Sequence, residues 1–537
     1  MGVSVDLTPN DAAVSATVRR KRLASEDTRS AVSHRMKPSS LPAVFSRAVG
    51  VALATATLTL AGCAAGPNFK PPAPPKVSGY VAQPPTTTAA ASGVAGGAAQ
   101  HFATGADISG DWWTLFHSSP LDTLIDAALE HNHDLKAAQA ALQVAQEDVL
   151  AQRGAFFPGV SAGLDASRQR LSEVLAPVPN YPVVPEEFLY SLFTPQLSIS
   201  YAPDLFGRNR RTVESLRAQA QAVRFQMIAV WTTLTSNVVV TAVQEASLRE
   251  QLAATRKLLA LETKSLDILQ FRFQKGDASK LDVAAQQAQL AQVQTGLPAL
   301  VKQLAQARHA VAALTGRFPD QAPAESFTLA DLRLPQELPV SLPSKLVAQR
   351  PDVRQARANL HAASAAIGIA AAERLPNIQL SATAGSTALA ISNVFTSGTG
   401  FWGAAASLAS PIFQGGALRH QERAAKAAYV EAAQQYRSTV LGAFQNVADT
   451  LVALQQDAET LQAAATAEQA AKATLDLAQL QLRHGYIGVF QLLAAEQSYQ
   501  QARVALVQAE ASRFTDTAAL YQALGGGWWH HKSLREQ

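Results

Sequence analysis

Two long stretches of the chain have the hydrophobic spacing of packed helices. Residues 208–274 contain neither proline nor glycine, and Leu252, Leu259, Leu266 and Phe273 are seven residues apart. In a later stretch, multiples of seven separate Leu454, Leu461, Leu475 and Leu482. This spacing places apolar side chains on one helix face and is typical of helices that pack side by side. At 1.5 Å per residue, the first helix would be on the order of 100 Å long.

Each long helix is predicted to fold back on itself. The glycine-containing turns at 275–277 and 484–486 interrupt the pattern, and shorter helical stretches follow at 280–314 and 489–524. The chain is therefore expected to form two helix hairpins, at 208–315 and 414–524. The many alanines allow close helix packing, and Gln, Ser and Thr leave a mildly polar third face.

A different hydrophobic pattern, with a period of two residues, precedes each hairpin. Apolar residues alternate with small polar ones, as at Val160, Ala162 and Leu164 in one stretch and at Ile378 and Leu380 in another. A period of two predicts strands, which we place at 156–170, 192–203, 376–387 and 399–411. Such strands suit a transmembrane barrel or a soluble half-buried hairpin. Four strands cannot close a barrel alone, so a barrel would require several chains.

The order of elements is written twice. Asp134 recurs as Asp352 after 218 positions, and Gly276 recurs as Gly485 after 209 positions. We expect a first repeat at 106–342 and a second at 343–525, each with a helix, two strands and a long helix hairpin. The offset shrinks because a proline-rich loop lengthens the first repeat near 171–192. Residues 526–537 are predicted to be a C-terminal tail with an exposed end.

The N-terminal residues have the pattern of a secretory signal. Positive residues at Lys37 and Arg47 precede an apolar run at 49–60, which ends in Leu60-Ala-Gly-Cys63. Residues 1–62 are predicted to be a leader and lipoprotein signal peptide, with translation starting at Met36 because acidic residues before it are unlike a leader. Cys63, the only cysteine, would carry N-acyl and S-diacylglycerol groups. The Pro-, Gly- and Thr-rich residues 63–105 would form an extended, acylated tether.

Composition argues against nucleic-acid binding and catalysis. The net charge is +4 over 537 residues, and much of the positive excess lies before residue 50. Apart from residues 48–61, no apolar run is expected to cross a membrane as a helix. His131-Asn132-His133 reads as a solvated loop before a helix, and His530-His531 as part of the exposed tail rather than a metal site. We therefore expect no enzyme, no metal and no cofactor other than the covalent lipid on Cys63.

Several segments resemble the outer membrane factor family, the TolC-like exit ducts of efflux systems, in its lipoprotein branch. The segments are Leu60-Ala-Gly-Cys63 with Gly66-Pro67-Asn68-Phe69, Asp204-Leu-Phe-Gly207-Arg208, Ser279 through Gln292, and Leu342-Pro343-Ser344-Lys345-Leu346 with Arg350-Pro351-Asp352. The resemblance implies an α+β membrane protein. Its homotrimer would have a twelve-strand outer-membrane β-barrel, four strands per chain, continued by a helical periplasmic tunnel. It also implies a periplasmic adaptor and an inner-membrane pump, of the proton-driven RND type, as partners.

The family resemblance also implies a gate at the periplasmic tip, and here the sequence departs from its relatives. Relatives carry Asp residues after the second turn, whereas residues 485–494 contain no carboxylate. The candidate gate residues are Asp277, Asp282, Ile487, Phe490 and Gln491. We expect closure by apolar packing of Ile487 and Phe490, with Asp277 as a possible contributor. The alternative for Asp282 is a helix cap.

These observations predict passive conduction of drugs or other small molecules from the periplasm to the exterior, by a lipid-anchored protein of the bacterial outer membrane. Two other interpretations stay open. One is the outer-membrane duct of a protein secretion system. The other is a non-conducting trimeric coiled-coil envelope protein, which would need one continuous helix per chain rather than two hairpins.

Overall fold

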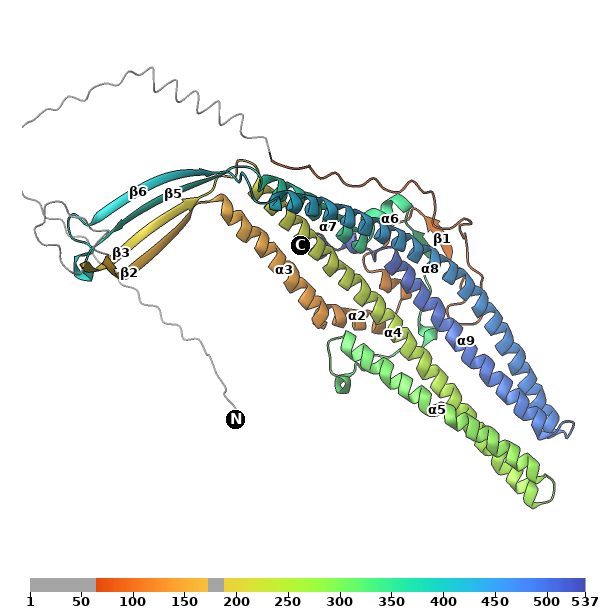
Figure 1. Ribbon diagram of the computed structural model, residues 1–537. Coiled ribbons are helices and arrows are strands. Elements are labelled where there is room, and N and C mark those ends of the chain that lie inside the picture. The colour runs from red at the N-terminus through yellow and green to blue at the C-terminus, as the bar shows by residue number, and fades with distance from the viewer. Residues whose placement is uncertain (1–63, 172–187, 537) are drawn as a thin grey trace, which may run out of the picture. The chain divides into compact units, whose positions relative to one another are not determined.

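The computed structural model describes residues 64–171 and 188–536, all of which belong to one compact unit. The predicted leader 1–62, the start at Met36, the lipidation site Cys63 and most of the proline-rich loop lie outside the described residues. The unit combines one antiparallel sheet with long helices that extend from it (Figure 1).

The sheet has four strands, β2 (Gly159–Leu171), β3 (Phe188–Tyr201), β5 (Asn377–Ser386) and β6 (Gly400–Ala409). They lie in the order β2-β3-β5-β6, and each neighbouring pair is antiparallel. The strands curve away from the helices (Figure 1). All four coincide with predicted strands to within a few residues, although β3 begins four residues earlier than expected.

The strand register gives the sheet two chemically different faces. Across the sheet, Val160 pairs with Ile199, Ile199 with Ala382, and Ala382 with Ala404. The adjacent row joins Ser161, Ser198, Thr383 and Gly403. Because side chains alternate along a strand, the first row and every second row after it are mostly apolar, whereas the rows between them carry mainly small or polar side chains.

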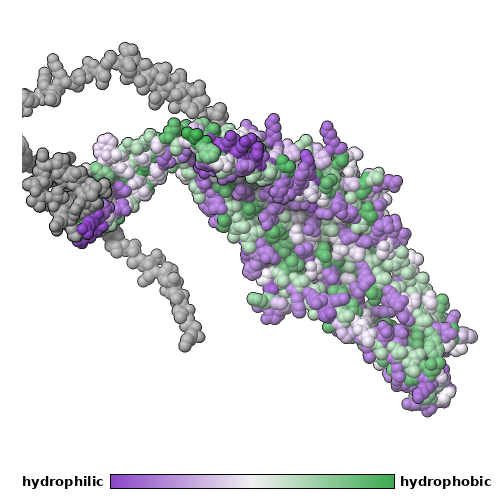
Figure 2. Space-filling view, in the orientation of Figure 1, coloured by the Kyte–Doolittle hydropathy of each residue, from purple (hydrophilic) through white to green (hydrophobic). Residues whose placement is uncertain are grey.

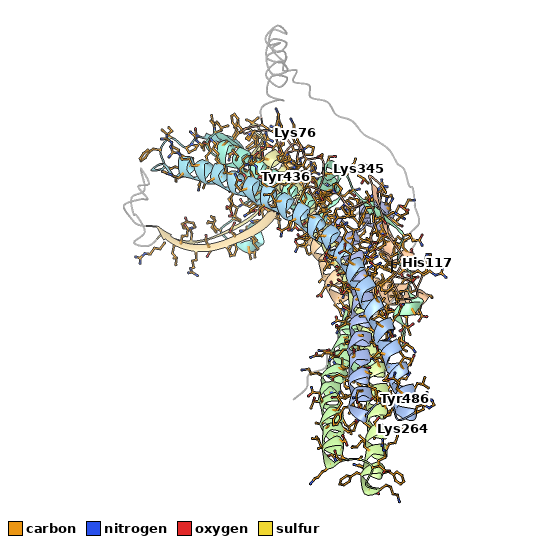
Figure 3. The ribbon with its side chains drawn as sticks, turned by 90° about the vertical axis from the view of Figure 1, so that its right-hand side faces the viewer. Lys76, His117, Lys264, Lys345, Tyr436 and Tyr486 are labelled. Atoms are coloured by element: carbon orange, nitrogen blue, oxygen red, sulfur yellow. The ribbon has the colours of Figure 1, made fainter. Side chains whose placement is uncertain are left out.

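The two helix hairpins were predicted almost to the residue. The first joins α4 (Arg208–Gln274) to α5 (Lys280–Leu314), and the second joins α8 (Ala417–Arg483) to α9 (Val489–Ala523). The long helices both have 67 residues and the return helices both have 35. Both turns lie at the end of the helices that is remote from the sheet (Figure 1), where Tyr486 is labelled in Figure 3.

Two further helices lead into the sheet. α3 (His133–Arg153) precedes β2, and α7 (Pro351–Ala372) precedes β5. Both pack against α4. α3 ends at Arg153 and α7 ends at Ala372. The prolines at 158 and 376 account for the ends, since the residues before a proline are biased out of the helical region.

Several short elements were not predicted. They are α2 (Ser119–His131), α6 (Pro343–Gln349) and the parallel strands β1 (His101–Thr104) and β4 (Glu337–Val340). Single turns of helix and a last short helix complete the described chain: Trp112–Phe116, Gly154–Phe156, Pro319–Gln321, Leu329–Asp331, Ile391–Asn393, Trp528–His530 and α10 (Lys532–Glu536).

The main hydrophobic core lies where the two repeats meet around α4 and α9. Trp112 and Phe116 are fully buried there, and the ring of Trp112 stacks on Tyr521 at 5.0 Å between centroids. Phe514 packs near Phe116 at 6.2 Å. Large aromatic side chains bury about 150–250 Å² each and dominate the energetics of such a core. The core therefore packs the residues just before α2 against α9.

Three segments that were expected to be loose are packed. The tether is extended for most of its length, but it contains β1, and the fully buried Arg513 donates hydrogen bonds to Thr88 and Ala98. In the tail, Trp528 is buried and donates to the carbonyl of Gln349 at 2.7 Å. Asn132 is also buried, accepts from the amide of Leu135 and so caps α3. The expectations of a solvated loop and an exposed tail were therefore wrong for Asn132, which donates to the carbonyl of Leu314, and for Trp528, which packs in the main core, whereas His131, His133 and His530 are exposed.

One helix also passes a simple test for membrane crossing, contrary to expectation. Within the described residues, α4 is long and apolar enough by composition, but 61% of its most apolar window is buried inside the fold. A buried helix of this kind is typical of a protein core, so the length and composition of α4 are weak evidence for a membrane-spanning helix.

Candidate functional site: the two-faced sheet, its junction and the hairpin tips

The apolar face of the sheet is open in the single chain. Val160, Leu164 and Leu197 are 67%, 60% and 53% exposed, and Trp402 and Leu408 are 82% and 69% exposed. Apolar residues also appear along the strands and at their junction with the helices in Figure 2. A contiguous apolar surface of this extent is unfavourable in water. The face is therefore suited to contact with hydrocarbon.

Large side chains flank this face where the strands meet the helices. Phe157 precedes β2 and is 72% exposed, and Phe413 follows β6 and is 88% exposed. Aromatic residues gather at membrane–water interfaces, where a ring meets both apolar and polar surroundings. Their positions on opposite edges of the sheet fit an interfacial girdle.

The opposite face carries hydroxyls, amides and glycines. Ser161, Ser198 and Thr383 lie side by side on β2, β3 and β5. Small polar side chains leave room for water, as in the lumen of a transmembrane barrel. The sheet thus separates a surface for lipid from a surface for water.

Among residues 64–171 and 188–536, the outer strands β2 and β6 each pair with one strand. Their free edges carry unpaired backbone amides and carbonyls, which cost several kcal/mol each in hydrocarbon. A sheet with one apolar face and two free edges is complete only when other strands pair with it.

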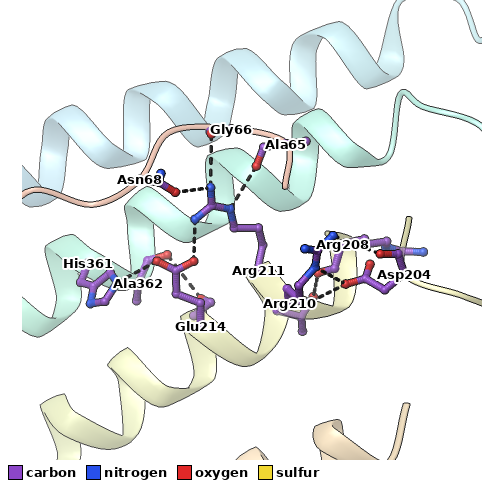
Figure 4. Close-up of polar contacts among 12 residues, drawn as sticks. Ala65, Gly66, Asn68, Asp204, Arg208, Arg210, Arg211, Glu214, His361 and Ala362 are labelled. Carbon is purple, nitrogen blue, oxygen red and sulfur yellow. Dashed lines mark hydrogen bonds and ion pairs between the residues drawn. The ribbon is translucent and has the colours of Figure 1, made fainter. Parts of the chain in front are cut away.

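A compact polar network joins the sheet to the helices (Figure 4). Asp204 accepts hydrogen bonds from the backbone amides of Asn209 and Arg210 and pairs with the Arg210 side chain at 3.2 Å, which satisfies the first turn of α4. Gly207 has φ +80° and touches Ala64, so a side chain there would meet backbone. The Asp204–Arg208 motif therefore builds a tight strand-to-helix junction.

The first described residues of the tether bind at this junction. The nearly buried Arg211 guanidinium donates to the carbonyls of Ala65 and Gly66 and to Asn68 Oδ1 (Figure 4). Arg211 also pairs with Glu214 at 2.7 Å, and Glu214 contacts His361 Nε2 at 2.9 Å. Burial opposes ionisation of Glu214, but the hydrogen bonds from Arg211 and His361 outweigh it and lower its pKa. The residues after position 63 are thus held beside the base of the sheet.

The acidic gate candidates lie in the first turn. Asp282 forms a capping box, because its carboxylate accepts from the amide and hydroxyl of Ser279, both at 2.8 Å. The hydrogen bond from the Ser279 amide is the main cause that lowers the pKa of Asp282. Asp277 is exposed beside Gly276, which has φ +84°. The alternative interpretation of Asp282 as a helix cap therefore agrees with its contacts.

The apolar gate candidates differ from one another. Ile487 is half-buried and packs within its own hairpin against a cluster that includes Leu475 and Leu492. Phe490 is 46% exposed, and Gln491 is exposed beside Gly488. Across the described residues, no hydrogen bond or ion pair joins the first turn to the second. Phe490, rather than Ile487, is free to contact groups outside the hairpin.

One polar cluster was missed from the sequence. Glu262 of α4, Gln286 of α5 and Glu496 of α9 are 0%, 0% and 4% exposed. The signal was present, since Glu262 follows the buried Leu258 by four residues and Glu496 follows the buried Leu492 by four. A carboxylate at a position that continues an apolar stripe marks a buried polar site.

These features are those of an outer-membrane channel protein. The chain belongs to the outer membrane efflux protein family, whose model matches residues 124–317 and 342–526. The two matched ranges correspond to the two copies of the element order.

Two relatives and one solved structure illustrate the likeness. The pyoverdine export outer membrane protein OpmQ of Pseudomonas putida is 32% identical over 417 residues, 78% of this chain and 88% of the relative. The probable efflux pump outer membrane protein TtgC of Pseudomonas putida is 29% identical over 494 residues, 91% of this chain and 97% of the relative. The outer-membrane channel OprN has 26% identity and a TM-score of 0.75, over 87% of this chain and 100% of that chain.

Proposed function

We propose that this chain is the outer-membrane channel component of a tripartite efflux pump and conducts small molecules passively out of the periplasm. The observation that carries the proposal is the four-stranded sheet with one apolar face, one polar face and two free edges. The efflux and export proteins named above support it. The two hairpins per chain also contradict the continuous helix that a coiled-coil stalk requires.

The channel is a homotrimer in this proposal. Transmembrane barrels need about eight strands or more, whereas one chain supplies four. Pairing of β6 of one copy with β2 of the next would give a closed barrel of twelve strands from three chains. Closure removes every free edge from the hydrocarbon, and it places the row of Ser161, Ser198 and Thr383 in the lumen.

The helices would continue the duct into the periplasm, where a periplasmic adaptor and an inner-membrane pump of the proton-driven RND type are the proposed partners. The channel itself would offer a water-filled path, and the pump would supply the energy. The pump would also select the cargo.

The proposed lipid anchor on Cys63 agrees with the junction. Ala65 and Gly66 are bound by Arg211 at the base of the sheet, so Cys63 would lie within a few residues of the membrane surface in this arrangement. Acyl chains at this position would enter the bilayer beside the barrel. The anchor and the strands would thus act at the same membrane surface.

The gate is proposed to close by apolar contacts among the second turns of the three copies. Phe490 supports this role because it is partly exposed, and Ile487 supports it by packing the turn that presents Phe490. Asp277, Asp282 and Gln491 would surround these contacts with polar groups.

Removal of the protein from a cell that has no other channel for the same pump tests the function. We expect higher accumulation of a fluorescent pump substrate, restored by the wild-type gene but not by a variant that fails to insert. Purified trimers should also give discrete conductance steps in planar bilayers. Unchanged accumulation together with a silent bilayer would contradict the proposal.

A further inference from the structure

Two buried carboxylates lie on helices that pack together across the boundary between the hairpins, close enough for the charge of one to act on the other. Glu262 lies on α4 of the first hairpin and Glu496 on α9 of the second, and these helices pack together. Gln286 of α5 donates from Nε2 to Glu262 Oε2 at 2.6 Å and to the Glu262 carbonyl at 3.0 Å. Gln286, which belongs to the same hairpin as Glu262, thereby holds Glu262 in place. Glu496 has no comparable support.

The cluster leaves polar atoms without partners. Glu262 Oε1, Gln286 Oε1 and Glu496 Oε2 are buried and form no hydrogen bond within the described chain. A buried carboxylate that lacks partners strongly favours its protonated form, because the charged form has lost its hydration. Two such groups close together disfavour double ionisation further.

The electrostatics of Glu496 follow from this geometry. Burial and, second to it, the charge of Glu262 raise the pKa of Glu496 to about 7. Burial also raises the pKa of Glu262, against the opposing hydrogen bond from Gln286. Near neutral pH, Glu496 therefore gains its negative charge beside Glu262.

Other charged groups lie nearby without neutralising the pair. A cavity of about 340 Å³ reaches Glu496 and is lined by the titratable residues Glu250, Lys257, Tyr499 and Arg503. On α8, Glu468 and Lys472 act on Tyr499. Of all these groups, Glu262 is the one whose charge shifts the pKa of Glu496. The cavity offers a route for water when the pair ionises.

We propose that Glu262 and Glu496 form a proton-dependent contact that holds α4 against α9 and weakens as the pH rises. When Glu496 carries a proton, no charge on it opposes Glu262 and the two hairpins stay packed. When both carboxylates ionise, their repulsion and their need for water favour separation of the hairpins. Separation of the hairpins would open the duct, a consequence that rests on the channel function proposed above. The pH response of the contact does not rest on that function.

Proton linkage gives the direction in which the stability of the packed state changes with pH. The pKa of Glu496 is higher in the packed state than its ordinary value of 4.5, so the packed state binds more protons. The stabilisation is complete below about pH 4.5 and is lost as the pH rises through about 7. If separation restores an ordinary pKa, the equilibrium shifts toward separation by on the order of a hundredfold at the alkaline limit.

Hydrogen–deuterium exchange on the intact trimer tests the contact without attaching a probe to any side chain. After correction for the intrinsic pH dependence of exchange, we expect backbone protection at 258–266 and 492–500 to fall by tenfold or more between about pH 5.5 and about pH 8.5. Glu496→Gln should make protection independent of pH in this range. Glu262→Gln should act in the same direction, because it removes the repelling charge, and it serves if the first variant does not assemble.

The matched control is Asp516→Asn. The pKa of Asp516 is also raised to about 7, by burial and by a hydrogen bond with Asp457, but both residues belong to the second hairpin. This variant should retain the pH response at 258–266. Constant protection in the wild type, or an unchanged fall in both Glu→Gln variants, would overturn the proposal.

Bilayer conductance then separates the two hypotheses. A pH response in exchange with a silent bilayer at every pH would refute the channel function and leave the proton-dependent contact intact. Conductance without any pH response of exchange at 258–266 and 492–500 would support the channel function and refute the proton-dependent contact.

Discussion

A charge on one face of β3 should be far more harmful than the same charge on the next residue. Leu197 lies near the middle of the sheet, pairs with Ala162 and Ala384 and is 53% exposed on the apolar face. Ser198 points to the opposite face and pairs with Ser161 and Thr383. An arginine near the middle of a bilayer costs about 2–4 kcal/mol on a lipid-facing strand, whereas substitutions in the lumen are tolerated. Leu197→Arg should therefore cost this amount three times in a trimer.

The assay is the fraction of protein recovered from outer membranes as trimer, together with the temperature at which the trimer dissociates in detergent. Leu197→Arg is expected to abolish or strongly reduce assembly. Ser198→Arg should assemble at near wild-type levels and shift the ion selectivity of the conductance toward anions. Equal losses for the two variants, or a greater loss for Ser198→Arg, would refute the assignment of the faces.

Three further predictions concern the junction, the tip and the anchor. Arg211→Met should destabilise the docked tether by about 2–3 kcal/mol and increase proteolysis within residues 64–105, since it leaves Glu214 without its buried partner, whereas Arg208→Met, at an exposed ion pair, should cost less than about 1 kcal/mol. Phe490→Ser together with Ile487→Ser should raise the leak conductance of the purified trimer; an unchanged leak would count against an apolar gate. Cys63→Ser should abolish incorporation of labelled fatty acid while trimers still form, and retained label would disprove lipidation at this residue.

The long helices were predictable because their limits are set locally. Gly207 and Gly276 bracket α4 and both have positive φ values, and no proline or glycine interrupts the helix between them. The capping box at Ser279 and Asp282 is equally local, since it depends on residues three apart. Strand faces follow from a period of two in the same way. Signals of this kind are complete within a short window of sequence.

The docked tether had no such signal. Arg211 and Arg513 bind it largely through backbone carbonyls, such as those of Ala65, Gly66 and Ala98, and every residue type presents the same group. Composition alone favours a flexible tether in that segment. The partners of Glu262 could not be predicted for a related reason. Heptad spacing shows which face of a helix is buried, but it does not show which distant helix covers that face.

The two turns must be distinguished from the contact that restrains them. In the proposed gate, side chains such as Phe490 would set the width of the aperture without fixing the separation of the hairpins, since no hydrogen bond or ion pair joins the two turns within the described residues. That separation is restrained where α4 packs on α9, at a level that includes Glu262 and Glu496. In the proposed channel, the absence of carboxylates from residues 485–494 would therefore not remove electrostatic control from the helical end. That control would pass from exposed charges at the aperture to buried charges between the hairpins, where the low polarity of the surroundings strengthens electrostatic interactions.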